Sequence, residues 1–142
     1  MTSGSIRMLV VDDNPLDIRA LIRAAKRLGL GHEFQVATNG DEAIDLLREW
    51  ADEQKLPDMM LFDLHLPGVD GLDLLVHRSS VPALREIPTV VLTTSSDDTD
   101  IRSVYEAGAS AFITKPADLD GWLDVIAKID DFWFKTATLP PR

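Results

Sequence analysis

Short apolar runs alternate along the chain with longer segments in which apolar residues recur at helical spacing. Ile18, Leu21, Ile22 and Ala25, for example, share one face of a helix. The apolar runs are short enough for buried strands. They cover residues 6–11, 34–37, 59–62, 89–93 and 111–113. The pattern therefore predicts five strands, each followed by a helix.

Such an alternation is typical of a parallel sheet, because parallel strands need crossover connections and the helices cover both faces of the sheet. We therefore expect a doubly wound α/β domain over residues 1–131. The end of its third helix, somewhere between Ser79 and Leu84, is not fixed by the pattern. Residues 132–142 lie beyond the last predicted helix and form a C-terminal tail.

The charge balance limits the partners of the protein. The 142 residues include 14 Lys and Arg against 24 Asp and Glu, a net charge of −10 at pH 7. This sign disfavours nucleic-acid phosphates and anionic lipid surfaces. An apolar share of 45% supports a buried core, and the absence of cysteine excludes disulfides and thiolate metal sites. Without a membrane-length apolar run or an export signal, we expect a cytoplasmic protein.

Polar side chains stand at the ends of the predicted strands, where sites of parallel sheets form. Asp12 and Asp13 follow the first strand, and Asp63 follows the third. If those strands are neighbours, three carboxylates converge, and Mg²⁺ would relieve their repulsion. Thr93 ends the fourth strand and Lys115 follows the fifth. A hydroxyl and an ammonium suit phosphoryl oxygens, so the set predicts phosphate chemistry on a carboxylate.

Each of these residues also has an ordinary structural explanation. Asp12 or Asp13 could cap the helix that follows, and Asp63 could begin a turn. Lys115 could be a solvated surface residue, and Thr93 could serve only strand packing. Taken together, however, the set favours the chemical interpretation.

Four segments in this order resemble the response-regulator receiver domain of two-component signalling. They are residues 10–15, 61–71, 87–95 and 108–116. The resemblance covers residues 6–131 and implies a flavodoxin-like strand order, 2-1-3-4-5. It also implies a protein that accepts a phosphoryl group from a sensor histidine kinase and later loses it by hydrolysis, rather than a turnover enzyme.

The resemblance implies a role for each acid. Asp63 would be the phosphoacceptor. Mg²⁺ would be held by Asp12, Asp13 and Asp63, with a further ligand from the backbone carbonyl of His65.

The resemblance implies that the remaining motif residues respond to the phosphoryl group. Lys115 would pair with it, and its peptide bond to Pro116 is expected to be cis. Thr93 would move to bond a phosphoryl oxygen, and Phe112 matches the aromatic residue that turns inward as this threonine moves. Output would come from a shift between two conformations.

Two positions that vary in the family would tune the lifetime of the phosphorylated form. Here they are His65 and Ser95, two residues beyond Asp63 and Thr93. A phosphatase of the haloacid-dehalogenase type would need an acid at position 65 as proton donor, so His65 argues against that alternative. A receiver-like binding module that works without phosphorylation is a second alternative, which the intact motif residues disfavour.

Further segments resemble the small single-domain regulators that partner phytochrome-type histidine kinases. These segments are residues 90–96, 113–120, 129–134 and 139–140, with a lengthened stretch between Leu72 and Pro88. The resemblance implies a phytochrome-type kinase as phosphoryl donor. It also implies output through protein contact, without a DNA-binding domain.

The tail contains three consecutive aromatic residues, Phe132, Trp133 and Phe134. A continuing helix cannot direct all three into its own domain, so at least one should be exposed or meet another chain. We expect a homodimer formed through the last helix and this tail. Packing of the tail onto its own domain is the alternative.

Overall fold

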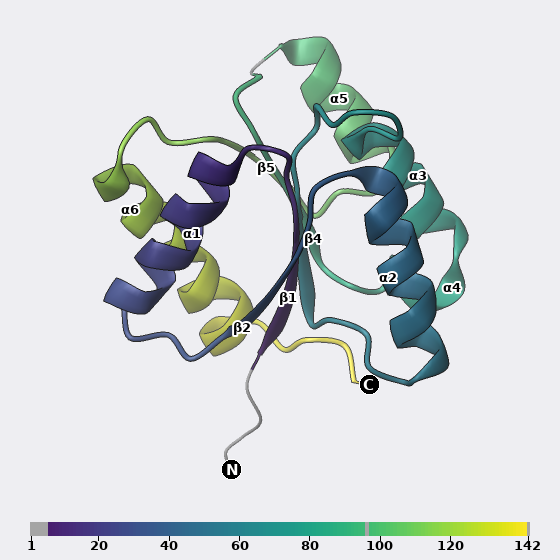
Figure 1. The fold of residues 1–142 in the computed structure, drawn as a ribbon, viewed down its shortest axis with the longest axis horizontal. Helices are drawn as coiled ribbons and strands as arrows, with labels where there is room; N and C mark the ends of the chain where they lie inside the picture. The colour runs from purple at the N-terminus through teal and green to yellow at the C-terminus, as the bar shows by residue number, and fades with distance from the viewer. Residues whose placement is uncertain (1–5, 96, 142) are drawn as a thin grey trace.

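The computed structural model describes residues 6–95 and 97–141. Its five parallel strands form one sheet in the order β2-β1-β3-β4-β5, as the sequence predicted (Figure 1). Each strand lies within one residue of its predicted bounds. The strands are β1 (Arg7–Val11), β2 (Glu33–Ala37), β3 (Met59–Phe62), β4 (Thr89–Thr93) and β5 (Ala111–Thr114). Residues 1–5, Ser96 and Arg142, which belong to predicted segments, lie outside the described residues.

Helices cover both faces of the sheet. One face carries α1 (Pro15–Arg27) and α6 (Leu119–Ile129), which pack against each other (Figure 1). The other face carries four helices. They are α2 (Gly40–Asp52), α3 (Gly71–Ser80), α4 (Pro82–Arg85) and α5 (Asp98–Glu106). Among the described residues, no helix has the length and apolar character needed to cross a membrane.

Side-chain caps set where the longer helices begin. The capping side chains accept hydrogen bonds from backbone N–H groups of the first helical turn. They are Asn14, Asn39, Asp70, Asp97 and Asp118. The boundary that the sequence left open falls at Val81, because Pro82 disfavours helical backbone at the residue before it.

Alternate residues of each strand point to opposite faces of the sheet, where they pack into two separate hydrophobic cores. In β1, Leu9 and Val11 pack toward α2–α5, whereas Met8 and Val10 pack toward α1 and α6. All residues of β3 and β4 are buried. Packing on both sides makes the sheet a rigid support for the residues at its carboxyl edge.

The tail continues α6 as a π-helix, η1 (Asp130–Thr136). Phe132 is 53% exposed, whereas Trp133 and Phe134 are half-buried against the core beneath α1 and α6. The expectation that at least one aromatic is exposed is therefore confirmed. The chain then passes beneath the sheet toward α2 and α4 (yellow in Figure 1).

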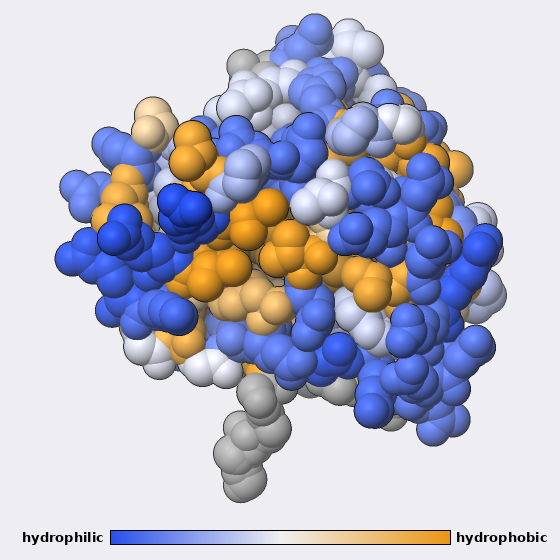
Figure 2. All heavy atoms as spheres, viewed as in Figure 1, coloured by the Kyte–Doolittle hydropathy of each residue, from blue (hydrophilic) through white to orange (hydrophobic). Residues whose placement is uncertain are grey.

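Apolar side chains also gather on the surface between α1 and α2 (Figure 2). The edge strand β2 lies there and carries the half-buried Phe34 and Val36. Both residues pack against the core beneath α1 and α6. This surface therefore continues the core outward at the edge of the sheet.

Candidate functional site

The pairing of β1 with β3 brings two distant acidic segments to one edge of the sheet. Val11 is in register with Phe62, so Asp12 and Asp63 leave adjacent strand ends. The Asp63 N–H donates to the Val11 carbonyl at 2.8 Å, and the Asp12 N–H donates to the Ala37 carbonyl at 3.0 Å. Backbone hydrogen bonds thus fix both acids at the carboxyl edge.

A glycine lets the next helix start close to Asp63. At Gly71, the first residue of α3, a Cβ atom would overlap the Asp63 carbonyl oxygen. Only a residue without a side chain allows this approach. The glycine that ends the Asp63 loop is thereby explained by packing beside the acid.

Three carboxylates meet at this edge, as the sequence predicted. Oxygens of Asp12, Asp13 and Asp63 lie within 4.8 Å of one another. Burial raises the pKa of Asp12 above its ordinary value, although hydrogen bonds from Lys115 and from the Asn14 N–H oppose the shift. A cluster of carboxylate oxygens with two buried members fits a hard divalent cation, which would offset their repulsion.

Lys115 reaches the acidic cluster from the end of β5. Its Nζ lies 2.8 Å from Asp12 Oδ2, 2.9 Å from Asp63 Oδ2 and 2.7 Å from Asp17 Oδ2. The side chain of Lys115 is only 4% exposed. Burial alone would lower the pKa of Lys115, but the hydrogen bonds to three carboxylates raise it above the ordinary lysine value. The ammonium therefore stays charged beside Asp63.

The peptide bond between Lys115 and Pro116 is trans, so the expected cis bond was wrong. No cis peptide bond occurs among the described residues. β5 pairs with β4 through Thr93 and Thr114, and the Lys115 N–H donates to the Thr93 carbonyl at 2.8 Å. This register and the long lysine side chain bring the ammonium to the carboxylates with the trans bond in place.

Thr93 and Phe112 stand where the sequence predicted them, at the end of β4 and in β5. Thr93 is fully buried, and the Ser95 N–H approaches its Oγ1 at 3.5 Å. Phe112 is half-buried against the core beneath α2–α5, and its N–H donates to the Tyr105 hydroxyl at 3.1 Å. Their part in a switch stays a prediction.

The two positions expected to tune the phosphorylated form share one neighbour, Asp100 in the first turn of α5. Ser95 Oγ donates to Asp100 Oδ2 at 2.6 Å, and His65 Nε2 lies 3.9 Å from the same oxygen. The His65 N–H also donates to Asp63 Oδ1 at 3.3 Å. The roles of His65 and Ser95, including the carbonyl ligand from His65, stay predictions.

Sequence reasoning missed Asp17 and Asp100. Asp17 follows Asp13 by four residues in the first turn of α1, and Asp100 holds a similar place in α5. An acid near a helix N-terminus is favoured by the helix dipole alone, so the position carries no specific signal. Only contacts to distant residues distinguish these two acids from ordinary surface acids.

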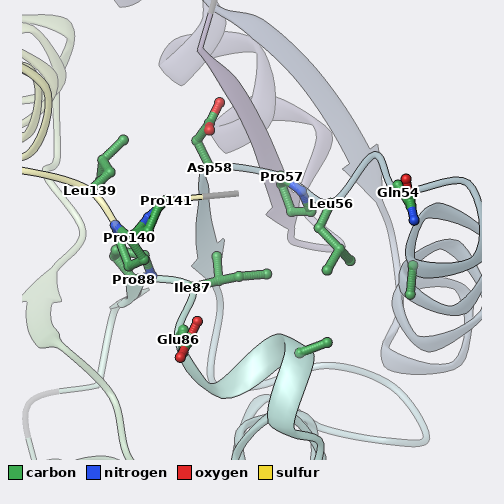
Figure 3. A pocket seen from close by; sticks show the side chains of 12 residues that line it. Gln54, Leu56, Pro57, Asp58, Glu86, Ile87, Pro88, Leu139, Pro140 and Pro141 are labelled. Carbon is green, nitrogen blue, oxygen red and sulfur yellow. The ribbon is translucent and has the colours of Figure 1, made fainter.

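A pocket lies at the edge of the sheet opposite the acidic cluster. It measures about 600 Å³ and lies between the segments that lead into β3 and β4 and the end of the tail (Figure 3). Its lining includes Pro57 and Ile87, and Pro88 lies beside Pro140 of the tail (Figure 3). Its lining is mainly apolar and lacks the converging carboxylates of the other edge.

The sequence from residue 8 to residue 127 matches the family model of the response regulator receiver domain. The chain therefore belongs to the response regulator receiver family. Among curated relatives, the response regulator Rcp1 of Synechocystis sp. is 32% identical over 135 residues, which cover 94% of this chain and 92% of Rcp1.

Solved structures of response regulators are similar over nearly the whole chain. The phosphorylated cyanobacterial phytochrome response regulator RcpA shares 37% identity, with a TM-score of 0.89 and coverage of 97% of this chain and 100% of RcpA. The Mn²⁺-bound form of Rcp1 shares 32% identity, with a TM-score of 0.85 and coverage of 96% and 99%. The similarity to phytochrome response regulators is thus confirmed.

Proposed function

We propose that this receiver domain accepts a phosphoryl group on Asp63 from a phosphohistidine of a sensor histidine kinase. The observation that carries the proposal is that the Asp63 carboxylate belongs to the acidic cluster and also contacts the Lys115 ammonium at 2.9 Å. One Asp63 oxygen attacks phosphorus while the P–N bond breaks, and the imidazole leaves with the electron pair of that bond. Charge on the phosphoryl oxygens must be stabilised as this happens.

Several groups around Asp63 contribute to stabilising the charge on the phosphoryl oxygens. Asp12, Asp13 and Asp63 would hold Mg²⁺, which would supply positive charge to the phosphoryl oxygens. Lys115 supplies a second positive charge beside Asp63, and its raised pKa keeps it protonated. After transfer, Thr93 bonds a phosphoryl oxygen and Phe112 turns inward, which favours the switched conformation.

Hydrolysis of the acyl phosphate ends the signal. Water attacks the phosphoryl group, and the carboxylate of Asp63 leaves. His65 and Ser95 flank the acceptor and the buried threonine, and they set how readily water enters. The protein thus accepts a phosphoryl group and limits the lifetime of its own phosphorylated form. It is not an enzyme for an external substrate.

We propose a phytochrome-type kinase as the donor, acting in the cytoplasm. The support is the similarity to RcpA and Rcp1, of which RcpA is described as a cyanobacterial phytochrome response regulator. Phosphotransfer from a phytochrome-type kinase should be faster than from unrelated histidine kinases at equal concentration. Equal rates from both kinds of kinase would contradict this part of the proposal.

The central experiment measures phosphorylation of Asp63 directly. The wild-type protein and the D63N variant are incubated with Mg²⁺ and a small acyl or amido phosphate, and intact masses are recorded. Wild type should gain one phosphoryl group that hydroxylamine removes, and D63N should gain none. Asp45→Asn, a change at an exposed acid of α2, serves as the matched control and should behave as wild type. Equal labelling of wild type and D63N would overturn the proposal.

We also propose that two copies associate through α6 and the tail. Phe132 is the exposed aromatic there and stacks edge-on against Trp133 at 4.9 Å. Sedimentation velocity should show dimers for wild type and monomers for Phe132→Glu. Val76→Glu changes an equally exposed apolar residue on α3 and should leave the dimer intact. An identical distribution for wild type and Phe132→Glu would count against the tail as the interface.

A further inference from the structure

The ammonium of Lys115 has three N–H donors, and the structure offers each of them a carboxylate. Two of these carboxylates, Asp12 and Asp63, belong to the cluster that fits a cation. The third, Asp17, lies outside that cluster and makes the shortest of the three contacts, 2.7 Å. All three N–H donors of the resting lysine therefore have a carboxylate partner. One of these partners, Asp17, has no place in the cation cluster.

Asp17 is held firmly in place by the start of α1. Asn14 caps this helix and accepts hydrogen bonds from the Leu16 N–H at 2.9 Å and from the Asp17 N–H at 3.4 Å. Lys115 is held at the other end by its own N–H bond to Thr93. The Asp17–Lys115 ion pair thus links α1 to the connection between β5 and α6, 98 residues away along the chain.

Phosphorylation would change the acceptors around Lys115 unequally. A cation would draw on the oxygens of Asp12 and Asp63, and a phosphoryl group would turn Asp63 from a carboxylate into an acyl phosphate. Both events weaken the attraction of these two acids for the ammonium. Asp17 keeps its full charge throughout, because neither event uses its oxygens.

We propose that Asp17 is a positioning residue, which holds the Lys115 ammonium at the site so that the lysine meets the phosphoryl group once its other partners are engaged. This inference rests on the proposed function. Asp17 touches neither the phosphoryl group nor the cation. It acts through Lys115, so its effect should vanish when Lys115 is absent.

Removing the charge of Asp17 should therefore leave uptake of the phosphoryl group possible while weakening the switch. In D17N the acceptor and the acidic cluster are intact. The lysine loses one charge-assisted hydrogen bond, which corresponds to roughly a tenfold change in an equilibrium. Because the resting state makes the same contact, only the part that strengthens once Asp12 and Asp63 are engaged shifts the equilibrium, so we expect the ratio of switched to resting protein at full phosphorylation to fall by about three- to tenfold.

The test compares wild type, D17N, K115A and the double variant D17N/K115A. Phosphoryl uptake is read by intact mass, and the switch is read from the backbone amide signals of Thr93 and Phe112 with Mg²⁺ and beryllium fluoride, a phosphoryl mimic. D17N should reduce the switched fraction, and the double variant should match K115A. D41N removes an equally acidic side chain from the first turn of α2 and should switch within about twofold of wild type.

The outcomes separate the two proposals. A wild type that gains no phosphoryl group overturns the proposed function itself. Normal uptake by wild type with equal switching of wild type and D17N overturns only the role of Asp17, as does a double variant that takes up the phosphoryl group more slowly than K115A. Should D17N not fold, Asp17→Ser provides a second uncharged variant, and Asp17→Glu should restore at least half of the switching.

Discussion

Two buried cations of this protein, Lys115 and Arg78, are stabilised in opposite ways. Lys115 lies among three carboxylates at the carboxyl edge of the sheet. The guanidinium of Arg78, whose residue is only 5% exposed, donates instead to backbone carbonyls. These belong to Arg85 at 2.9 Å, Gly108 at 2.9 Å and Ile87 at 2.7 and 3.2 Å.

The two environments move the pKa values in opposite directions. Burial lowers the pKa of Arg78, whereas the carboxylates around Lys115 outweigh the effect of burial and raise its pKa. Carbonyls at the ends of α4 and α5 offer only partial negative charge, yet they match the fork of a guanidinium. Arg78 thus fastens α3 to α4 and to the turn before β5.

On the proposed function, the difference separates a cation that holds helices together from one that responds to a ligand. The carbonyls around Arg78 are fixed by the backbone and cannot be exchanged without unfolding the region. On the proposed function, two of the carboxylates around Lys115 would change partners, because Asp12 and Asp63 would bind a cation and Asp63 would take the phosphoryl group. A buried charge that must respond to a ligand therefore needs side-chain partners, and one that only holds helices together does not.

The largest expected effect is on stability, for Arg78→Ala. Loss of the guanidinium removes four hydrogen bonds to backbone carbonyls and the packing of a buried side chain, and we expect the free energy of unfolding to fall by about 3 kcal/mol. Urea unfolding followed by circular dichroism measures this loss. The folded fraction should still take up one phosphoryl group on Asp63. Unchanged stability would mean that the carbonyls find other donors, and it would contradict the structural role of Arg78.

Arg78→Lys separates the effect of the positive charge from that of the guanidinium shape. A lysine keeps the positive charge but lacks the planar guanidinium. It therefore cannot donate to the carbonyls of α4 and of the turn before β5 at the same time. We expect a loss of stability of about 1–2 kcal/mol, smaller than for alanine. The same urea unfolding measures it, and a loss as large as that of Arg78→Ala would show that charge contributes nothing here.

The next effect is on switching rather than on folding, for Lys115→Ala. The variant should still accept a phosphoryl group but should not change conformation, because the ammonium that meets the phosphoryl oxygen is gone. In metal-free buffer it should lose about 1–2 kcal/mol of stability, since charged hydrogen bonds to buried acids are removed. Amide signals of Thr93 that shift as in wild type would contradict the prediction.

The smallest effect concerns Asp12 and its dependence on pH. Burial raises its pKa in the folded protein above the ordinary 3.8, so the folded state binds the proton more tightly than the unfolded state. This contribution stabilises at low pH and is lost as pH rises from about 3.8 through the raised pKa. In metal-free buffer, D12N should therefore gain stability relative to wild type across that range.

Mg²⁺ should reverse the order of D12N and wild type. At tenfold excess over its dissociation constant, Mg²⁺ should stabilise wild type by about 1.4 kcal/mol, because it binds only the folded protein. D12N should gain much less, and Arg78→Lys should gain as much as wild type. Melting temperatures with and without Mg²⁺ at pH 7 provide the measurement. Equal gains for D12N and wild type would exclude Asp12 as a ligand.

Local patterns were sufficient to predict the sheet and its acidic edge. Buried parallel strands are continuous apolar runs, so their positions are visible in the sequence. Parallel strands also align their carboxyl ends, so Asp12, Asp13 and Asp63 could be expected to meet once β1 and β3 were taken as neighbours. The expected cis bond at Pro116 had only the family resemblance behind it, and it was wrong.

The partners of the two cations could not be predicted in this way. Asp17 lies 98 residues from Lys115, and Gly108 lies 30 residues from Arg78. At the level of sequence, Asp17 is an ordinary acid in a first helical turn, and Arg78 is an ordinary basic residue in a last one. Their special role depends on which helix ends pack together, and no local pattern encodes that.

The alternation of strands and helices, the edge at which chemistry can occur, and the acids that follow β1 and β3 are all visible in the order of the residues. The tertiary structure alone decided that Asp17 shares Lys115 with the acidic cluster and that carbonyls of two helix ends enclose Arg78. The reason is physical: periodicity and strand ends are properties of neighbouring residues, whereas the stabilisation of a buried charge depends on every group that packing brings around it.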